Sequence, residues 1–544
     1  MATSDVWTND VHFGTDGWRA VIDEGFNLQT LARVAEATAQ AYLLLAAGKI
    51  GDAGAGGSTG AGSAGVGSTA DTASSGTPDV TGESDTGFSP TLYIGYDCRR
   101  NAGRYASFVA SIVAGFGLNV LVSDRYCPTP ALCWTIAQDP RAIGGIMLTA
   151  SHNPAEYLGV KLRMADGGAS PDWFSKRVEG LLSAAEPAGF ERAGGVFAAA
   201  SNATPDQPAG PLPQAGFGYT DLMRPYLENL ATVVDREAIA RADLSVVLDP
   251  MYGAGRGYLC QVLRDLGVQV YELHGESDPD FAGLHPEPIL PWVQQGADKV
   301  AELGYAACLV NDGDADRIGS IDTTGKYVTS HRLICLLIAH LVEDRGLTGR
   351  VVRTSAGSNL LRRQALRLGL ELVTRPIGFK YIYEEMLAGN VLIGGEESGG
   401  FGIPWHVHER DGLLMALLLV EMMAQRGKHL AELVDEMLAQ LGVLEYNRLD
   451  LRLLFEQQDA FVNAHVKPGI HDFDFYRQLF VAVNEELIEI DRADGIMLRF
   501  ASDAWLLART SGTEPLVRIY AEAANMEQVE ALIDVGRAMA EGRI

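Results

Sequence analysis

The sequence has few cysteines, no long apolar run and no excess of basic residues. Its six cysteines lie in or beside apolar segments and never form a CxxC pair. This pattern argues against a disulfide framework or a cysteine zinc site and favours reduced thiols in the cytoplasm. No apolar run reaches the roughly 18 residues that predict a membrane span. The first residues lack the basic region and apolar core of a signal peptide, so we predict a cytoplasmic protein that does not associate with membranes.

Acidic residues outnumber basic residues in the chain. The chain carries 43 Lys and Arg against 70 Asp and Glu, which gives a formal net charge of -27. A surface of this sign does not favour nucleic acid or anionic membranes, so an anionic substrate would need local pockets of arginine and lysine. The length of 544 residues predicts three or four domains. The apolar fraction of 47% is ordinary for a protein with large cores.

Strand-like apolar segments alternate with segments of helical periodicity through most of the chain. A helix is predicted from Leu28 to about Ala47, with Asn27 as its N-cap. Strand, helix and strand at short spacing are typical of a parallel α/β layer. The strands predicted in such layers are 92–97, 119–122, 146–148, 244–249, 269–273 and 306–310.

Polar stretches divide the predicted domains. Residues 51–88 are largely Gly, Ser, Ala and Thr and cannot bury enough surface to offset their ordering entropy, so we predict a flexible insertion. A polar stretch from about 185 to 217 predicts a boundary. The tail from about 446 has strand-like runs at 496–500, 504–508 and 516–521 and a closing helix, which predicts a small α+β domain. The predicted domains are α/β at 1–215, 216–325 and 326–445, and α+β at 446–544.

A serine loop follows one of the predicted strands. In Thr149-Ala150-Ser151-His152-Asn153-Pro154, the serine comes directly after the apolar run 146–148. Reactive loops of parallel α/β sheets lie at the carboxyl ends of strands. Because Pro154 disfavours helix and Asn153 can hold the turn, we expect the Ser151 hydroxyl to be presented by the loop and not packed.

An acidic loop follows the predicted strand at 306–310. Asp312, Asp314 and Asp316 alternate with small residues, so an extended loop can turn all three carboxylates toward one hard cation. An EF-hand-like calcium loop fits poorly, because Arg317 stands where glycine is wanted and Thr323 where glutamate is wanted. A solvated acidic turn and a haloacid-dehalogenase-type phosphatase with Asp312 as nucleophile stay open as alternatives.

Three further loops have residues suited to a phosphosugar. The stretch 509–515, with Arg518 beyond it, combines guanidinium, hydroxyl and glycine N–H groups that suit a phosphate, although a plain hairpin is also possible. Glu396 and Ser398, among four glycines, can bond sugar hydroxyls or form a simple turn. The stretch Phe13–Arg19 has two glycines and an arginine that can reach an anion, or it is a hairpin. Taken singly, Lys380 and Arg410 are as compatible with surface charges.

Together these loops resemble the α-D-phosphohexomutase superfamily. The matching motifs are its serine loop (149–154), metal loop (312–317), sugar loop (395–400), phosphate loop (509–518) and amino-terminal signature (13–19). They occur in the family's order, and the resemblance covers nearly the whole chain except the insertion. It implies three related α/β domains with mixed or parallel sheets and a TBP-like α+β domain around one central cleft.

The resemblance also implies a mechanism. Ser151 carries a phosphoryl group, Mg²⁺ held by Ser151 and the three aspartates contacts that group, and glucose 1,6-bisphosphate serves as intermediate and activator. The residues implied at the transferring phosphoryl group are Arg19, Lys161 and Arg317. Those implied at the sugar are Gly378, Glu396, Ser398 and Arg410. Those implied at the second phosphate are Arg509, Ser511, Gly512, Thr513 and Arg518.

One residue departs from a common family pattern. Bacterial phosphomannomutase/phosphoglucomutases and phosphoglucosamine mutases often have a histidine where this chain has Gly400, so proton transfer would fall to Lys380 or His152. The Glu-Glu-Ser motif and Gly378-Phe379-Lys380 look more like the phosphoglucomutase branch. We therefore predict interconversion of α-D-glucose 1-phosphate and glucose 6-phosphate.

Other functions stay open at this stage. A phosphomannomutase or phosphoglucosamine mutase is the first alternative, and a metal-dependent sugar-phosphate phosphatase or a non-enzymatic phosphosugar-binding protein is of another class. The serine beside the metal loop argues against the last two. The predicted partner is a small-molecule phosphosugar, with no nucleic acid and no membrane, and the protein is a monomer or a homodimer.

Overall fold

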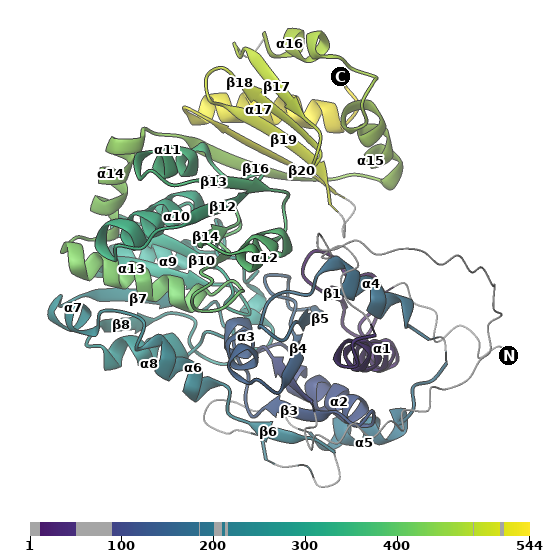
Figure 1. Ribbon diagram of the computed structural model, residues 1–544. Helices are drawn as coiled ribbons and strands as arrows, with labels where there is room; N and C mark the ends of the chain where they lie inside the picture. Colours follow the sequence, from purple (N-terminus) through teal and green to yellow (C-terminus); the bar gives the residue numbers. More distant parts are fainter. Residues whose placement is uncertain are drawn as a thin grey trace, which may run out of the picture.

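The computed structural model describes residues 11–49, 90–183, 185–200, 209–210, 212, 216–481, 484–511 and 516–544. These residues form four sheets that follow one another along the chain, each with its own helices (Figure 1). The predicted class, three α/β domains followed by a C-terminal domain, is confirmed. The insertion predicted at 51–88 lies outside the described residues.

The first domain is built on a six-stranded sheet in the order β1-β5-β4-β2-β3-β6. Its central strands β4, β2 and β3 are parallel, and β5 and β1 add antiparallel on one side. Helix α1 begins after Asn27, whose side chain accepts a hydrogen bond from Thr30 N, so the predicted helix and cap are confirmed. The elements are β1 (Trp18–Val21), α1 (Leu28–Ala46), β2 (Thr91–Tyr96), α2 (Ala102–Ala114), β3 (Asn119–Ser123), α3 (Thr129–Gln138), β4 (Ala142–Leu148), β5 (Tyr157–Arg163), α4 (Asp172–Gly180), α5 (Phe190–Ala199) and β6 (Gly218–Thr220).

The stretch predicted as a boundary contains structure. Helix α5 lies within 185–217, and its Phe190 and Phe197 pack edge-on against Phe108 of α2. Strand β6 then pairs in parallel with β3, so the first sheet continues beyond residue 215. The polar residues around α5 concealed these aromatic side chains, whose burial against α2 stabilises the helix.

The second and third domains repeat the α/β arrangement. The second sheet has the order β11-β10-β9-β7-β8, with β7, β8 and β9 parallel, and the third has the order β13-β12-β14-β15. Elements of the second domain are α6 (Met223–Leu230), α7 (Arg236–Arg241), β7 (Ser245–Asp249), α8 (Tyr258–Asp265), β8 (Gln269–Glu272), η1 (Phe281–Gly283), α9 (Gln294–Leu303), β9 (Ala307–Asn311), β10 (Ile318–Asp322) and β11 (Tyr327–Val328). Elements of the third are α10 (Ser330–Ala339), η2 (His340–Asp344), β12 (Arg350–Thr354), α11 (Asn359–Arg367), β13 (Leu372–Arg375), α12 (Phe379–Ala388), β14 (Val391–Gly395), β15 (Phe401–Gly402), α13 (Gly412–Arg426) and α14 (Leu430–Leu441).

The fourth domain is an antiparallel sheet in the order β16-β20-β19-β18-β17, covered by α17, and it stands at the top of Figure 1. The predicted strands and closing helix are confirmed. The helices α15 and α16 were not predicted from the sequence. The elements are β16 (Glu445–Arg452), α15 (Phe455–Phe461), η3 (Val462–Val466), α16 (Phe473–Val481), β17 (Leu487–Asp491), β18 (Ile496–Phe500), β19 (Trp505–Thr510), β20 (Leu516–Ala523) and α17 (Met526–Ala540).

Helix α13 is buried between the second and third domains. Asp411 caps it by accepting a hydrogen bond from Leu414 N, and its apolar side chains pack toward α7, α10, β9 and β10. Its leucines are fully enclosed, including Leu417 at 0% exposure. In the part of the chain that the structure describes, no helix is long and apolar enough to cross a membrane. The burial of α13 follows from its packing against elements of both domains.

We predict that Leu417→Ala lowers the free energy of unfolding by about 2–5 kcal/mol, because it leaves a cavity in a close-packed helix interface. Leu366→Ala is the matched control, since Leu366 is 76% exposed, and it should change stability by less than about 0.5 kcal/mol. Urea denaturation of both variants measures the difference. Equal effects would contradict the assigned burial of α13.

Candidate active site

The serine loop lies at the carboxyl end of β4. Ser151 has a left-handed backbone with φ of +50°, and its hydroxyl donates to Asp312 Oδ2 at 2.8 Å. Ser151 is fully buried, so the expectation of a presented hydroxyl is wrong for this structure. The reason is the acidic loop of the second domain, which covers it so closely that a Cβ on Gly313 would lie 2.4 Å from Ser151 O.

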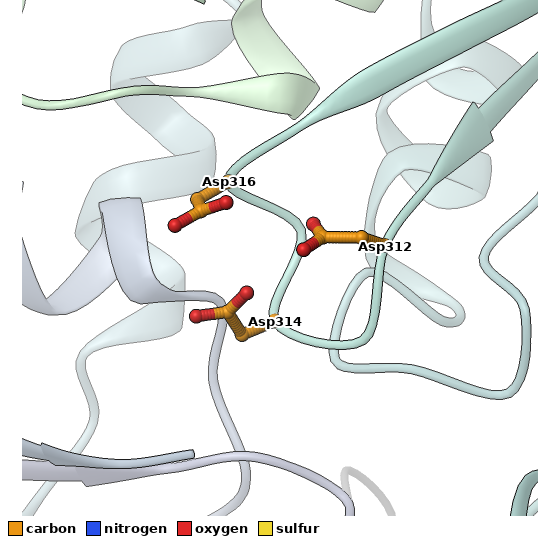
Figure 2. Close-up of side chains that lie close together, drawn as sticks. All are labelled: Asp312, Asp314 and Asp316. Atoms are coloured by element: carbon orange, nitrogen blue, oxygen red, sulfur yellow. The ribbon is translucent and has the colours of Figure 1, made fainter. Parts of the chain in front are cut away.

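The acidic loop connects β9 to β10. Asp312, Asp314 and Asp316 are each fully buried, and their carboxylates face a common point within 4.8 Å of one another (Figure 2). Asp314 Oδ1 and Asp316 Oδ1 are buried without a hydrogen-bond partner. Buried, unpaired carboxylate oxygens are costly unless a cation meets them. The donor set therefore fits a hard divalent cation such as Mg²⁺, and the alternative of a solvated acidic turn is wrong.

Lys161 on β5 partly neutralises the acidic loop. Its ammonium donates to Asp314 Oδ2 and Asp316 Oδ2, both at 2.8 Å, and lies 2.9 Å from Asp16 Oδ2. Burial lowers the pKa of Lys161, but these carboxylates raise it by a larger amount, so the net shift of the pKa is upward. Burial together with Asp316 and Asp314 raises the pKa of Asp312 well above its usual range. Lys161 and Arg410 bond Asp314 or Asp316, whereas the nearest cation to Asp312 is Arg317, whose Nε lies 4.0 Å from Asp312 Oδ2.

Arg410 joins three domains at this site. It is 3% exposed, and its guanidinium bonds Asp16 of the first domain, Asp316 of the second at 2.7 Å and Glu396 of the third at 2.9 Å. Its Nε also lies 3.3 Å from Glu409. The family resemblance implies that Arg410 binds the sugar, and the structure places its guanidinium inside an ion-pair network.

Three carboxyl and guanidinium groups of this network were missed from the sequence. Asp16 accepts from Arg163 at 3.2 Å, and Arg163 pairs with Glu409 at 3.0 Å. Asp16 lies within the Phe13–Arg19 motif, but only Arg19 of that motif was assigned a role from the sequence. No sequence signal marked Arg163 or Glu409, because each gains its partner only through folding.

Arg19, His152 and Arg317 lie around the serine. Arg19 Nη1 donates to Asn153 Oδ1 at 2.6 Å, and Arg317 Nε is 4.0 Å from Asp312 Oδ2. His152 Nδ1 lies 3.5 Å from Ser151 Oγ. Burial, with added repulsion from Arg317 and Arg19, holds the pKa of His152 well below its usual value. The imidazole is therefore neutral at pH 7.

The sugar loop and its neighbours belong to the third domain. Burial raises the pKa of Glu396 to about 7, although Arg410 opposes the shift. Ser398 lies half-buried in the turn between β14 and β15. Gly378, with φ of +134°, caps α12 beside Thr15. Lys380 donates to Asp172 of α4 at 2.5 Å, so its ammonium is bonded to the first domain and not to the acidic loop.

The phosphate loop follows β19 in the fourth domain. Arg509 and Arg518 are directly opposite one another in the β19–β20 pairing, so both guanidinium groups project from the same face of the sheet. Arg509 pairs with Asp494 at 3.2 Å, and Asp494 in turn accepts from Ile377 N of the third domain at 2.8 Å. Ser511 N donates to Leu516 O. Gly512 and Thr513 lie outside the described residues.

Comparison with known proteins extends over the same four domains. The sequence models described as phosphoglucomutase/phosphomannomutase alpha/beta/alpha domains I, II and III match residues 68–188, 224–325 and 329–441, and the model of the C-terminal domain matches 462–535.

The relatives are named for different sugars. A phosphoglucomutase/phosphomannomutase of Thermococcus kodakarensis is 31% identical over 82% of this chain and 89% of its own. A phosphoglucosamine mutase of Salinispora arenicola is 29% identical over 81% and 87%.

Solved structures agree on the fold. A putative phosphomannomutase from Thermus thermophilus is 31% identical, with a TM-score of 0.75 over 98% of this chain and 100% of its own. A phosphoglucomutase from Paramecium, parafusin, has a TM-score of 0.73 at 19% identity over 98% and 95%, which shows the fold alone. With all four domains matched in order, the chain belongs to the α-D-phosphohexomutase superfamily, the family of phosphoglucomutases and phosphomannomutases, and is an intramolecular phosphotransferase.

Proposed function

We propose that this phosphohexomutase is a phosphoglucomutase that interconverts α-D-glucose 1-phosphate and glucose 6-phosphate through a phosphorylated Ser151 and glucose 1,6-bisphosphate. The observation that carries the proposal is the 2.8 Å hydrogen bond from Ser151 Oγ to Asp312 Oδ2. It joins a hydroxyl acceptor of phosphoryl groups to a carboxylate cluster that fits a divalent cation. A mutase needs both groups at one point.

The same contact argues against a phosphatase with Asp312 as nucleophile. Asp312 Oδ2 accepts from Ser151, and Asp312 Oδ1 accepts from Arg317 N at 3.1 Å. These two bonds turn the carboxylate toward Ser151, the other possible phosphoryl acceptor, while its remaining lone pairs stay available to a cation. A phosphosugar-binding protein without catalysis would have no use for the serine at this place.

The charged side chains around Ser151 suit phosphoryl transfer. Mg²⁺ held by Asp312, Asp314 and Asp316 would supply neutralisation of the charge on the transferring group. Arg19, Arg317 and Lys161 place fixed positive charge near the serine, where preorganised groups stabilise a transition state without reorganising. Asn153 orients Arg19 through its 2.6 Å hydrogen bond.

The second phosphate of the substrate would lie against the fourth domain. Arg509 and Arg518 stand opposite one another on β19 and β20, and two like charges at such positions favour an anion between them. The pKa of His152 is lowered mainly by burial, and the charge of Arg518 adds to this effect. In this arrangement, one phosphate of the bisphosphate lies at Ser151 and the other lies between Arg509 and Arg518. When the bisphosphate turns over, the two phosphates exchange these places.

The sugar preference rests on the third domain. Glu396 and Ser398 offer hydrogen bonds to sugar hydroxyls, and Gly378 begins α12 next to Thr15. A Cβ at Gly400 would lie 2.3 Å from Arg410 Cδ, so the path of Arg410 excludes a histidine there. The support for glucose comes from the Glu-Glu-Ser motif at 396–398 and from Gly378-Phe379-Lys380, which resemble the phosphoglucomutase branch.

The alternative sugars are tested with a panel of substrates. Several relatives are named phosphoglucosamine mutase, which favours glucosamine as the second candidate, with mannose after it. We expect the highest kcat/KM with glucose 1-phosphate among the 1-phosphates of glucose, mannose and glucosamine, each assayed with its bisphosphate. A higher value for glucosamine 1-phosphate would overturn the glucose assignment and leave the mutase chemistry intact.

We predict that Ser151→Ala lowers kcat by about a thousandfold or more, because it removes the phosphoryl carrier without removing core volume. Mass spectrometry of the wild-type protein after bisphosphate treatment should find one phosphate on Ser151. Near-normal turnover of the folded variant would show that Ser151 is not the phosphoryl carrier.

Asp314→Asn should remove most Mg²⁺-dependent activity and weaken Mg²⁺ binding measured by calorimetry, because a neutral amide replaces a metal-facing carboxylate. Asp166→Asn is the control, since Asp166 is a half-exposed aspartate that bonds Tyr383 and His408. The metal assignment fails if wild-type activity survives excess chelator.

Arg518→Ala should raise KM for glucose 1-phosphate roughly ten- to a hundredfold, since one charge-assisted contact contributes about 1.5–3 kcal/mol. Activity should also depend more steeply on added glucose 1,6-bisphosphate, because the intermediate escapes more readily. Steady-state kinetics across a bisphosphate titration measure both effects. Unchanged KM and bisphosphate dependence would assign this loop a structural role.

A further inference from the structure

Arg99 is a buried arginine next to the serine loop that the proposed mechanism does not use. It follows β2 and is 1% exposed. Its guanidinium donates to the backbone carbonyls of Ser151, Asn153 and Pro154 at 2.6 Å each, and to that of Tyr157 at 3.1 Å. One side chain therefore binds four carbonyls across the whole turn that contains Ser151.

Asp97 and Thr149 complete a ring around Ser151. Arg99 Nε donates to Asp97 Oδ2 at 3.1 Å, and Thr149 Oγ1 donates to the same oxygen at 2.6 Å. Ser151 N donates to Thr149 Oγ1 at 2.9 Å. Since Ser151 O accepts from Arg99, the N–H and the C=O of this residue are both tied to one buried unit.

Such a unit is needed because the backbone of Ser151 is unfavourable. A φ of +50° in a residue with a Cβ costs about 1–3 kcal/mol unless its surroundings enforce it. The second domain closes the remaining side, where the Phe281 ring centroid lies 4.9 Å from the Arg99 guanidinium carbon. Within the described part of the chain, the side-chain hydrogen bonds of Arg99 go to Asp97, to the turn between β4 and β5 and to the first residue of β5.

We propose that Arg99, with Asp97 and Thr149, is a positioning unit that holds Ser151 Oγ in line for phosphoryl transfer, an inference that rests on Ser151 being the phosphoryl carrier. In the charging step, the bond from Ser151 Oγ to phosphorus forms and the bond from phosphorus to the sugar oxygen breaks. The serine proton passes, in net terms, to that sugar oxygen. Misplacement of the nucleophile by about 1 Å can cost a hundredfold in rate, while the grip on the second phosphate is unaffected.

The test compares Arg99→Lys and Thr149→Val with Arg100→Lys. Lysine keeps the charge beside Asp97 but cannot span four carbonyls from one nitrogen, and valine removes only the hydroxyl of Thr149. Arg100 is the matched control, because its side chain is 59% exposed and pairs with an exposed aspartate, Asp280. The readouts are kcat, KM, and the single-turnover rate of Ser151 phosphorylation by glucose 1,6-bisphosphate.

We expect Arg99→Lys and Thr149→Val to lower kcat and the single-turnover rate by about ten- to a hundredfold, with KM within about threefold of wild type and with full phosphorylation of Ser151 at long times. Arg100→Lys should match wild type. If each variant instead loses phosphorylatable sites while the rate per remaining site is unchanged, the unit is merely structural and the proposal is overturned.

Two controls keep the outcome interpretable. Should Arg99→Lys fail to fold, Thr149→Val decides, because it is nearly isosteric and leaves the arginine in place. Ser151→Ala in the same assay separates the two proposals: an active Ser151→Ala protein overturns the proposed function, whereas an inactive one beside a fully active Arg99→Lys protein overturns only the positioning role.

Discussion

Buried charges that must find partners hold the first three domains in one arrangement. Asp16, Asp316 and Glu396 come from three different domains and share one guanidinium, that of Arg410. Lys161 supplies a second cation to the same group of carboxylates. Removing one partner of such a network leaves an uncompensated buried charge, which costs several kcal/mol. The ion pairs therefore fix the positions of the loops relative to one another.

The fourth domain has an apolar core separate from that of the first three domains. One continuous apolar core extends through the first three domains as far as Leu444, whereas residues from Phe461 to Ala540 form a core of their own. Contact between the third and fourth domains includes Ile377 and Trp505 in a small separate cluster and the bond from Ile377 N to Asp494. A domain with its own core can shift as a unit, which suits the proposed gripping of a phosphate that changes ends during turnover.

The strained backbone of Ser151 is held by its surroundings. The left-handed Ser151 persists because buried hydrogen bonds hold it from one side and the acidic loop covers it from the other. The proposed nucleophile and the candidate metal ligands are thereby prepositioned before substrate binds. Catalysis that relies on orientation and fixed charge benefits from such preorganisation, and the proposed sugar preference is left to the more open third-domain loop.

Local sequence patterns were sufficient to predict many of the individual elements, although they missed α5, α15 and α16. The chemistry of each loop stays a prediction that the same patterns motivate. Helix α1 with its Asn27 cap, the strands that precede Ser151 and Asp312, and the α+β tail all follow from periodicity and capping, which act over a few residues. The burial of Ser151 and the meeting of Asp16 with Arg410 became evident only in the folded chain. Both depend on loops far apart in the chain being brought together by packing between domains, and no local pattern records which buried charge will find which partner.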